Sequence, residues 1–166
     1  MKKVFLMLFL ATFAIGSAIA QSATTAGINT NEVIVVNPLE ASMDVEFIGA
    51  YGDASTGRVS VIFRVRNKTN HDKANFGGGV PAQTAAFDPR GKTYFMPDKV
   101  SSAFVDVPNG IWVEIRLDER RLSFSNVPET TKSFELINVA TVIGNSSARG
   151  MVQFRSVPIQ WGVVPE

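Results

Sequence analysis

The ten residues Arg58-Val59-Ser60-Val61-Ile62-Phe63-Arg64-Val65-Arg66-Asn67 decide the fold class of this chain. Their side chains alternate in polarity, with a period of two residues. This is the period of a β-strand, whose successive side chains point to opposite sides of the sheet. One face carries Val59, Val61, Phe63 and Val65, and the other carries Ser60, Ile62, Arg64 and Arg66. The stretch therefore predicts a strand with one face in a hydrophobic core.

The segment before this strand alternates in the same way. Residues 52–57, which separate the two segments, are Gly-Asp-Ala-Ser-Thr-Gly and are rich in turn formers. Two alternating runs joined by such a turn predict a β-hairpin. In the first run one face is expected to carry Val45, Phe47, Gly49 and Tyr51, and the other Asp44, Glu46 and Ile48.

Short strand signals recur along the rest of the chain, separated by turn residues. In the sequence Asp-Pro-Arg-Gly at 88–91, Pro and Gly suit the second and fourth positions of a type I turn, so residues 84–96 predict a second hairpin. The sequence Pro-Asn-Gly at 108–110 predicts a third hairpin, between residues 100–107 and 111–117, with Ile111 pointing inward. Strands are also expected at residues 33–36, 80–87, 93–96, 133–143 and 150–156.

This pattern of elements predicts an all-β protein. No window shows a long apolar pattern at helical spacing, and Pro or Gly lies in every gap. Eight or so short strands with frequent turns are typical of a two-sheet sandwich or a small barrel. We expect an immunoglobulin-like antiparallel two-sheet sandwich, with a small β-barrel as the alternative.

The first 20 residues have the features of a secretory signal peptide. Lys2 and Lys3 precede an apolar run of about 12 residues, which is too short for a membrane helix, and small residues occupy Ala18 and Ala20. We expect cleavage after Ala20, a flexible mature N-terminus over residues 21–31, and a single sandwich domain over residues 32–166. Cleavage would leave 14 of the 16 basic side chains against 15 acidic ones, which argues against nucleic acid as a partner.

The chain contains no cysteine. A bacterial lipoprotein carries its lipid on a cysteine at the cleavage point, so we expect a product that is not lipid-anchored and does not stay inserted in the membrane. The predicted location is the periplasm or the extracellular space.

Four pieces of the sequence resemble a known group of proteins. They are the strand at residues 59–67, the sequence Phe-Asp-Pro-Arg-Gly-Lys-Thr-Tyr at 87–94, Val-Pro-Asn-Gly-Ile-Trp-Val-Glu-Ile at 107–115, and Val-Pro-Ile-Gln-Trp at 157–161. In this order they resemble uncharacterised exported immunoglobulin-like β-sandwich proteins of Gram-negative bacteria. The resemblance covers roughly residues 40–161 and implies a sandwich in the cell envelope. Its motifs are turn and packing motifs, so it implies no catalytic residue.

Several residues are candidates for catalysis or metal binding. His71 is the only histidine, and with no cysteine beside it we expect an exposed loop residue and no metal site. The triple glycine at 77–79 lacks the Lys and Ser/Thr of a phosphate loop. The acids Asp44, Glu46, Asp106, Glu114 and Asp118 could in principle pair for glycoside hydrolysis.

Trp112 is the most promising binding residue in the sequence. Alternation places it on the outward face of its strand beside Glu114 and Arg116. An exposed Trp between charges can stack on a sugar or anchor a protein partner, whereas a neighbouring strand or loop could instead cover it. The candidate ligand-binding residues are Trp112, Tyr94 and Arg116.

The sequence favours an exported, non-enzymatic binding or structural module without a cofactor, whose partner is an envelope protein or a glycan. A carbohydrate-binding module that uses Trp112 is the first alternative. A hydrolase based on paired carboxylates is the second.

Overall fold

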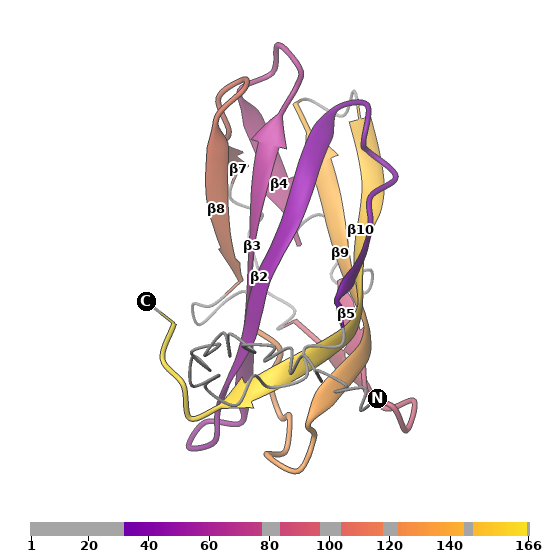
Figure 1. The fold of residues 1–166 in the computed structure, drawn as a ribbon, viewed down its shortest axis with the longest axis vertical. Coiled ribbons are helices and arrows are strands. Elements are labelled where there is room, and N and C mark those ends of the chain that lie inside the picture. Colours follow the sequence, from indigo (N-terminus) through magenta and orange to yellow (C-terminus); the bar gives the residue numbers. More distant parts are fainter. Residues whose placement is uncertain (1–31, 78–83, 97–103, 118–122, 145–147, 166) are drawn as a thin grey trace, which may run out of the picture.

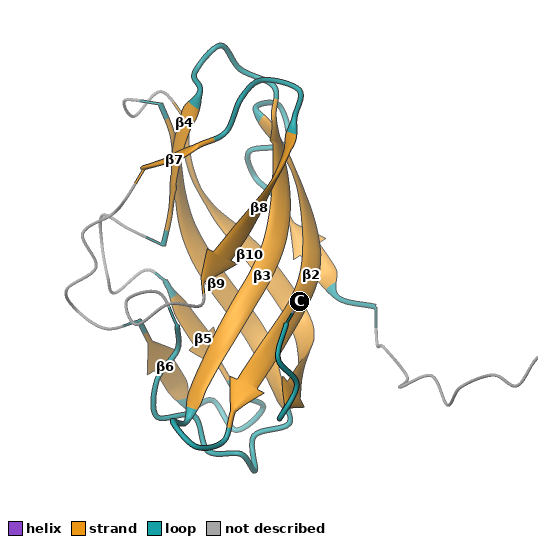
Figure 2. Cartoon of the chain, turned by 90° about the vertical axis from the view of Figure 1, so that its left-hand side faces the viewer, coloured by secondary structure: helices purple, strands orange, loops and turns teal. Residues whose placement is uncertain are grey.

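A computed structural model describes residues 32–77, 84–96, 104–117, 123–144 and 148–165. This part of the chain contains ten strands and no helix (Figures 1 and 2). The all-β prediction is therefore confirmed. The strands are β1 (Ile34–Val36), β2 (Met43–Asp53), β3 (Arg58–Asn67), β4 (Lys73–Phe76), β5 (Ala85–Phe87), β6 (Thr93–Phe95), β7 (Phe104–Asp106), β8 (Trp112–Leu117), β9 (Ser133–Ile143) and β10 (Ala148–Trp161).

The strands lie in two layers that face one another (Figure 2). One layer contains β2, β3 and β8, and the other has the order β6-β5-β9-β10, with β4 beside β9, β7 beside β4 and β1 beside β10. Strand β10 joins the layers: it pairs antiparallel with β9 up to Pro158, and from Ile159 it pairs parallel with β2. The arrangement is consistent with a β-sandwich.

Two details of the predicted fold need correction. The β10–β2 pairing is parallel, so the sheet is mixed and not antiparallel throughout. The strand path runs from β6 to β8 without closing within the described ranges, so the alternative of a small barrel is not supported. The parallel pairing arises because the long strand β10 leaves its hairpin partner β9 and reaches the other layer.

The predicted hairpin of β2 and β3 is confirmed, as is the buried face of β3. Its four inward residues are fully buried, and they are Val59, Val61, Phe63 and Val65. The predicted face of β2 holds only as far as Phe47, because the register shifts between Phe47 and Gly49. This β-bulge places one extra residue in β2 and reverses the alternation. Ala50 therefore belongs to the core in place of Gly49 and Tyr51.

Aromatic rings fill the space between the layers. Phe63 on β3 lies with its ring centroid 5.3 Å from that of Phe154 on β10 and 5.6 Å from that of Phe76 on β4. Farther along the core, Phe134 on β9 contacts Phe124 and the ring of Tyr94. These contacts contribute to the apolar connection between the two layers.

The second predicted hairpin is confirmed, and the third is wrong. Strand β5 pairs with β6 across the turn at 88–91. Strand β7 pairs with β4, however, and β8 pairs with β3, so the turn at 108–110 carries the chain from one layer to the other. The turn reverses the chain as predicted, but the partner of each strand is determined by contacts with residues far away in the sequence. Ile111 precedes β8 and is 57% exposed, so its inward prediction is also wrong.

Asn67 forms hydrogen bonds with the segments on either side of this change of layer. Its buried side chain donates a hydrogen bond from Nδ2 to the Val107 carbonyl (2.9 Å) and a second to the His71 carbonyl. The Gly110 N–H in turn donates to the Asn67 carbonyl (2.8 Å). The side-chain amide thus connects the end of β3 to the loop before β4 and to the residue after β7, and the backbone carbonyl of Asn67 connects it to the turn before β8.

The predicted signal peptide and the mature N-terminus up to residue 31 lie outside the described residues. Within the described ranges, no helix has the length and hydrophobicity needed to cross a membrane.

Candidate functional site

One concave site among the described residues is built on the turn between β5 and β6. The Gly91 N–H donates to the Asp88 carbonyl (2.9 Å), which closes the predicted turn, and Gly91 has a φ of 79° that favours glycine. The Asp88 carboxylate accepts hydrogen bonds at Oδ1 from the backbone N–H groups of Arg90 and Lys92, both 2.9 Å long. The short Asp side chain therefore holds its own turn in shape.

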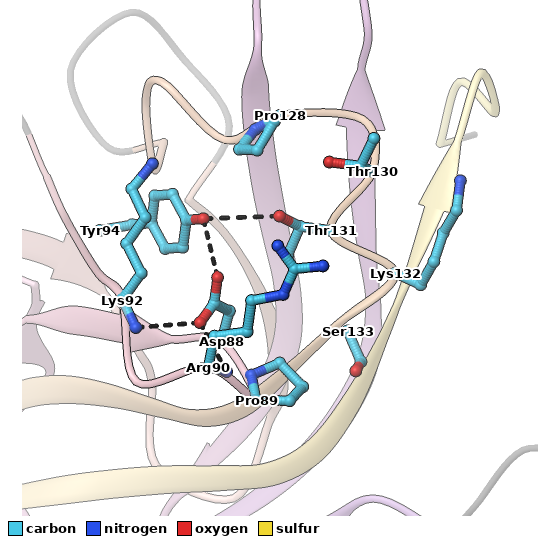
Figure 3. A pocket seen from close by; sticks show the side chains of 10 residues that line it. All are labelled: Asp88, Pro89, Arg90, Lys92, Tyr94, Pro128, Thr130, Thr131, Lys132 and Ser133. Carbon is cyan, nitrogen blue, oxygen red and sulfur yellow. Dashed lines mark hydrogen bonds between the residues drawn. The ribbon is translucent and has the colours of Figure 1, made fainter.

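A chain of hydrogen bonds continues from this turn to the entry of β9. The hydroxyl of Tyr94 donates to Asp88 Oδ2 (3.1 Å) and lies 3.4 Å from Thr131 Oγ1, as Figure 3 shows. The indole Nε1 of Trp161 donates to the Thr131 carbonyl (2.8 Å). Asp88, Tyr94 and Thr131 are buried, so they form a fixed floor.

Above this floor is a pocket of about 330 Å³, which we call the hairpin pocket. Two separate segments form it, the β5–β6 turn and the residues that lead into β9. Its size lies at the lower end of the range for small-molecule sites. Its lining residues are Asp88, Pro89, Arg90, Lys92, Tyr94, Pro128, Thr130, Thr131, Lys132 and Ser133.

The charge of Asp88 is stabilised within the protein. Burial by itself raises the pKa of this carboxyl, but the hydrogen bonds from the Lys92 and Arg90 N–H groups and from the Tyr94 hydroxyl outweigh it, so that the pKa is lowered overall. Asp88 is therefore ionised at neutral pH, with its lone pairs directed at internal donors.

The rim of the pocket is cationic. Arg90, Lys92 and Lys132 are exposed and belong to the lining. Lys92 Nζ lies 4.8 Å from the centre of the Tyr94 ring, and Lys132 Nζ donates to the Glu129 carbonyl (3.1 Å). Within the described ranges, the Arg90 guanidinium has no hydrogen bond or ion pair.

Trp112 lies on the outer face of β8, as predicted, and is half-buried. The guanidinium carbons of Arg64 and Arg66, on neighbouring β3, each lie 5.0 Å from the centre of its ring. Arg66 is also paired with Asp44 (2.7 Å). Part of the Trp112 ring is thus covered by two cations of its own sheet, which favours a structural role for this residue.

The structure does not bring the three predicted binding residues together. Arg116 is on the same face as Trp112 and pairs with Glu114 at 2.5 Å. Tyr94 lies on β6, at the opposite end of the strand order from β8, and is only 3% exposed. Tyr94 therefore cannot complete a stacking surface with Trp112. Its hydroxyl instead belongs to the floor of the hairpin pocket.

The other sequence candidates form no shared site among the described residues. His71 is exposed, with its ring against Gly144. Asp44 is paired with Lys68 and Arg66, whose hydrogen bonds lower its pKa, and Glu46 is paired with Arg64. No group of three or more possible metal ligands occurs in the described ranges. Asp118, Gly78 and Gly79 lie outside them.

A second concave surface lies between β1 and β2. It has a volume of about 470 Å³ and is lined largely by apolar side chains, among them Val33, Val35, Val45 and Phe47. The bulged Ile48 borders it and is 43% exposed.

Sequence reasoning identified the turn at 88–91 and missed its role in a pocket. Its partner segment, residues 128–133, lies before and at the start of the strand predicted at 133–143, and the sequence predicted no binding role for it. The available signal was the run of hydroxyl and basic side chains Thr130, Thr131, Lys132 and Ser133, but nothing local indicates that it faces Arg90.

Comparisons with protein-family models, with curated proteins and with solved structures find no match.

Proposed function

We propose that this chain is an exported, non-enzymatic binding module of the cell envelope, and that the hairpin pocket is its ligand site. The observation that carries the proposal is the contrast between floor and rim. The floor is held by internal hydrogen bonds, whereas the Arg90 guanidinium on the rim makes no hydrogen bond or ion pair within the described ranges and acts on Asp88 only through its charge. A rigid floor under available donors is the usual construction of a small-molecule site.

The strand order supports the proposal of an immunoglobulin-like sandwich, and with it the binding-module proposal. Strands β2, β3 and β8 follow the order A-B-E of immunoglobulin domains, and β5, β9 and β10 follow the order C-F-G. Sandwiches of this kind often bind ligands through the loops that cluster at their ends. The hairpin pocket is built from such connections.

The hydrolase alternative receives less support from the pocket. A general acid must hold a proton at working pH, and enzymes raise the pKa of a carboxyl to achieve this. The pKa of Asp88 is shifted the other way, and its oxygens already accept hydrogen bonds from Arg90, Lys92 and Tyr94. A structural role for this carboxylate suits a binding site.

Blocking the pocket tests the proposal. Thr130→Trp adds a large ring at an exposed lining residue, and Val164→Trp adds the same ring at a position that is 86% exposed and outside the lining. Solubilised envelope glycans and proteins would be titrated against each purified mature protein. We expect saturable binding that Thr130→Trp abolishes and Val164→Trp retains. Equal binding by both variants would refute the pocket as the site.

Export has its own test. The full precursor would be expressed in a Gram-negative host, and the mass of the periplasmic or secreted product measured. We expect a product that begins at Gln21. A protein that keeps residues 1–20 would contradict the predicted cleavage.

A further inference from the structure

The charges around the hairpin pocket indicate which class of ligand it takes. Three cationic side chains and one carboxylate line the pocket, so its net charge is positive. The carboxylate, Asp88, is buried beneath the rim and accepts three hydrogen bonds from its own hairpin. It therefore has little capacity left for a ligand, and the rim offers mainly donors.

Of the three cationic side chains, Arg90 has the most N–H groups that can donate to a ligand. In Figure 3 its side chain extends from the turn toward Thr131, between the two segments that form the pocket. A guanidinium presents its N–H groups in a planar fork that matches the two oxygens of a carboxylate. Lys92 lies on the turn side and Lys132 on the β9 side, so positive charge flanks this fork.

The rest of the lining suits a hydroxylated ring. The hydroxyls of Thr130, Thr131 and Ser133 come from the segment that leads into β9, and each can donate or accept a hydrogen bond. Pro89 and Pro128 add apolar surface. A sugar ring combines hydroxyl groups with apolar C–H faces, and a single ring agrees with the small volume of the pocket.

We propose that the hairpin pocket binds a carboxylated sugar, with the ligand carboxylate on Arg90 and the ring hydroxyls on the Thr130–Ser133 segment. This inference rests on the proposed function and narrows it to one ligand chemistry. It also replaces Trp112 as the centre of carbohydrate recognition, because that ring already lies against Arg64 and Arg66.

The test uses three probes of graded chemistry with the mature protein. Galacturonic acid has both the ring and the carboxylate, galactose has the ring alone, and inorganic phosphate is an oxyanion without a ring. Binding would be followed by chemical-shift changes in amide NMR spectra, which also show whether each variant is folded. We expect galacturonic acid to bind at least tenfold more tightly than either other probe, with the largest shifts in the hairpin pocket.

Two arginine variants assign the contact. Arg90→Gln removes the charge and the fork at the pocket. Arg149→Gln makes the same change at an exposed site on β10, opposite Val142 and at the far end of β9 from Ser133. Loss of a charge-assisted hydrogen bond should weaken galacturonic acid binding by about tenfold or more in Arg90→Gln. Arg149→Gln should bind as the wild type does.

Several results would overturn the inference. If galactose bound as tightly as galacturonic acid, the ligand carboxylate would not contribute to binding. If phosphate bound as tightly, the sugar ring would not contribute. Equal loss in both arginine variants, or no shifts in the pocket with any probe, would also reject it. If Thr130→Trp still abolished binding of an envelope component, the binding-module proposal would stand while this ligand class failed.

Discussion

Replacing Phe63 by Ala tests whether the two layers are held together by the aromatic contacts described above. Phe63 is fully buried on β3 and its ring contacts Phe154 and Phe76 from the opposite layer. Deleting a buried Phe ring loses its transfer free energy and leaves a cavity, at a cost of about 3–5 kcal/mol. Domains of this kind have a free energy of unfolding of about 5–15 kcal/mol, so the variant should lose a large fraction of it.

Phe95→Ala is the matched control, because it deletes the same ring from a side chain that is 50% exposed on β6. Unfolding by urea, followed by intrinsic fluorescence and by circular dichroism, would give the free energy of unfolding of each protein. We expect the midpoint to fall strongly in Phe63→Ala and only slightly in Phe95→Ala, with slopes close to the wild-type value. By a heat scan, the loss at Phe63 corresponds to a fall in Tm of roughly 6–20 °C.

Similar losses in the two variants would refute this reasoning, because the burial of Phe63 between the layers would then have no energetic consequence. A small loss in Phe63→Ala with an unchanged slope would refute it as well. Such a result would mean that the layers are held together by other contacts.

Three further predictions concern the parts of the fold that position the site. In Gly52→Ala, the new Cβ would lie 2.4 Å from the Trp161 ring, so we expect the ring to move and release its hydrogen bond to the Thr131 carbonyl. A lowered Tm and altered tryptophan fluorescence would show this, and wild-type behaviour would contradict it. The lowered pKa of Asp88 contributes stability that is fully present above the unfolded pKa of about 3.9 and is lost as pH falls through the lower folded value. Urea midpoints measured between pH 6 and pH 2 should therefore fall less steeply at the acid end in Asp88→Asn, and parallel curves for the two proteins would count against this. Asn67→Ala leaves two carbonyls without their buried donor, so we expect a loss of about 1–3 kcal/mol in urea unfolding, and a change within error would oppose the role of Asn67 in the change of layer.

Much of the strand content could be predicted from local patterns. The strand at 133–143 has the predicted bounds, and the four predicted inward residues of β3 are buried, because both depend on alternation within one segment. Ile62, predicted on the outer face of β3, is buried as well. The β2 face was predicted correctly only up to the bulge at Ile48, since nothing in the alternation marks an extra residue. The hairpin of residues 100–107 and 111–117 failed because a turn sequence fixes chain reversal but not the partner of each strand.

The candidate site shows the same limit. The turn at 88–91 follows from its own sequence, because Pro and Gly have restricted or special backbone angles. That Arg90 lies across a pocket from Thr130 depends on β5 pairing with β9, about 50 residues later in the chain. Sequence reasoning therefore favoured Trp112, whose outward position is a local property, over a pocket formed by two distant segments.

The sequence by itself determined the all-β class, most of the strands, the shape of the turns, and the charge and hydroxyl content of the segments that line the pocket. These are properties of residues and their near neighbours, and short-range sterics and hydrogen bonding are sufficient to set them. Only the tertiary structure decided that β10 crosses from β9 to β2, that β7 and β8 enter different layers, and that Tyr94 is buried beneath a cationic rim. Those outcomes depend on which distant strands bury the most apolar surface together while pairing their backbone groups, and no single segment contains that information.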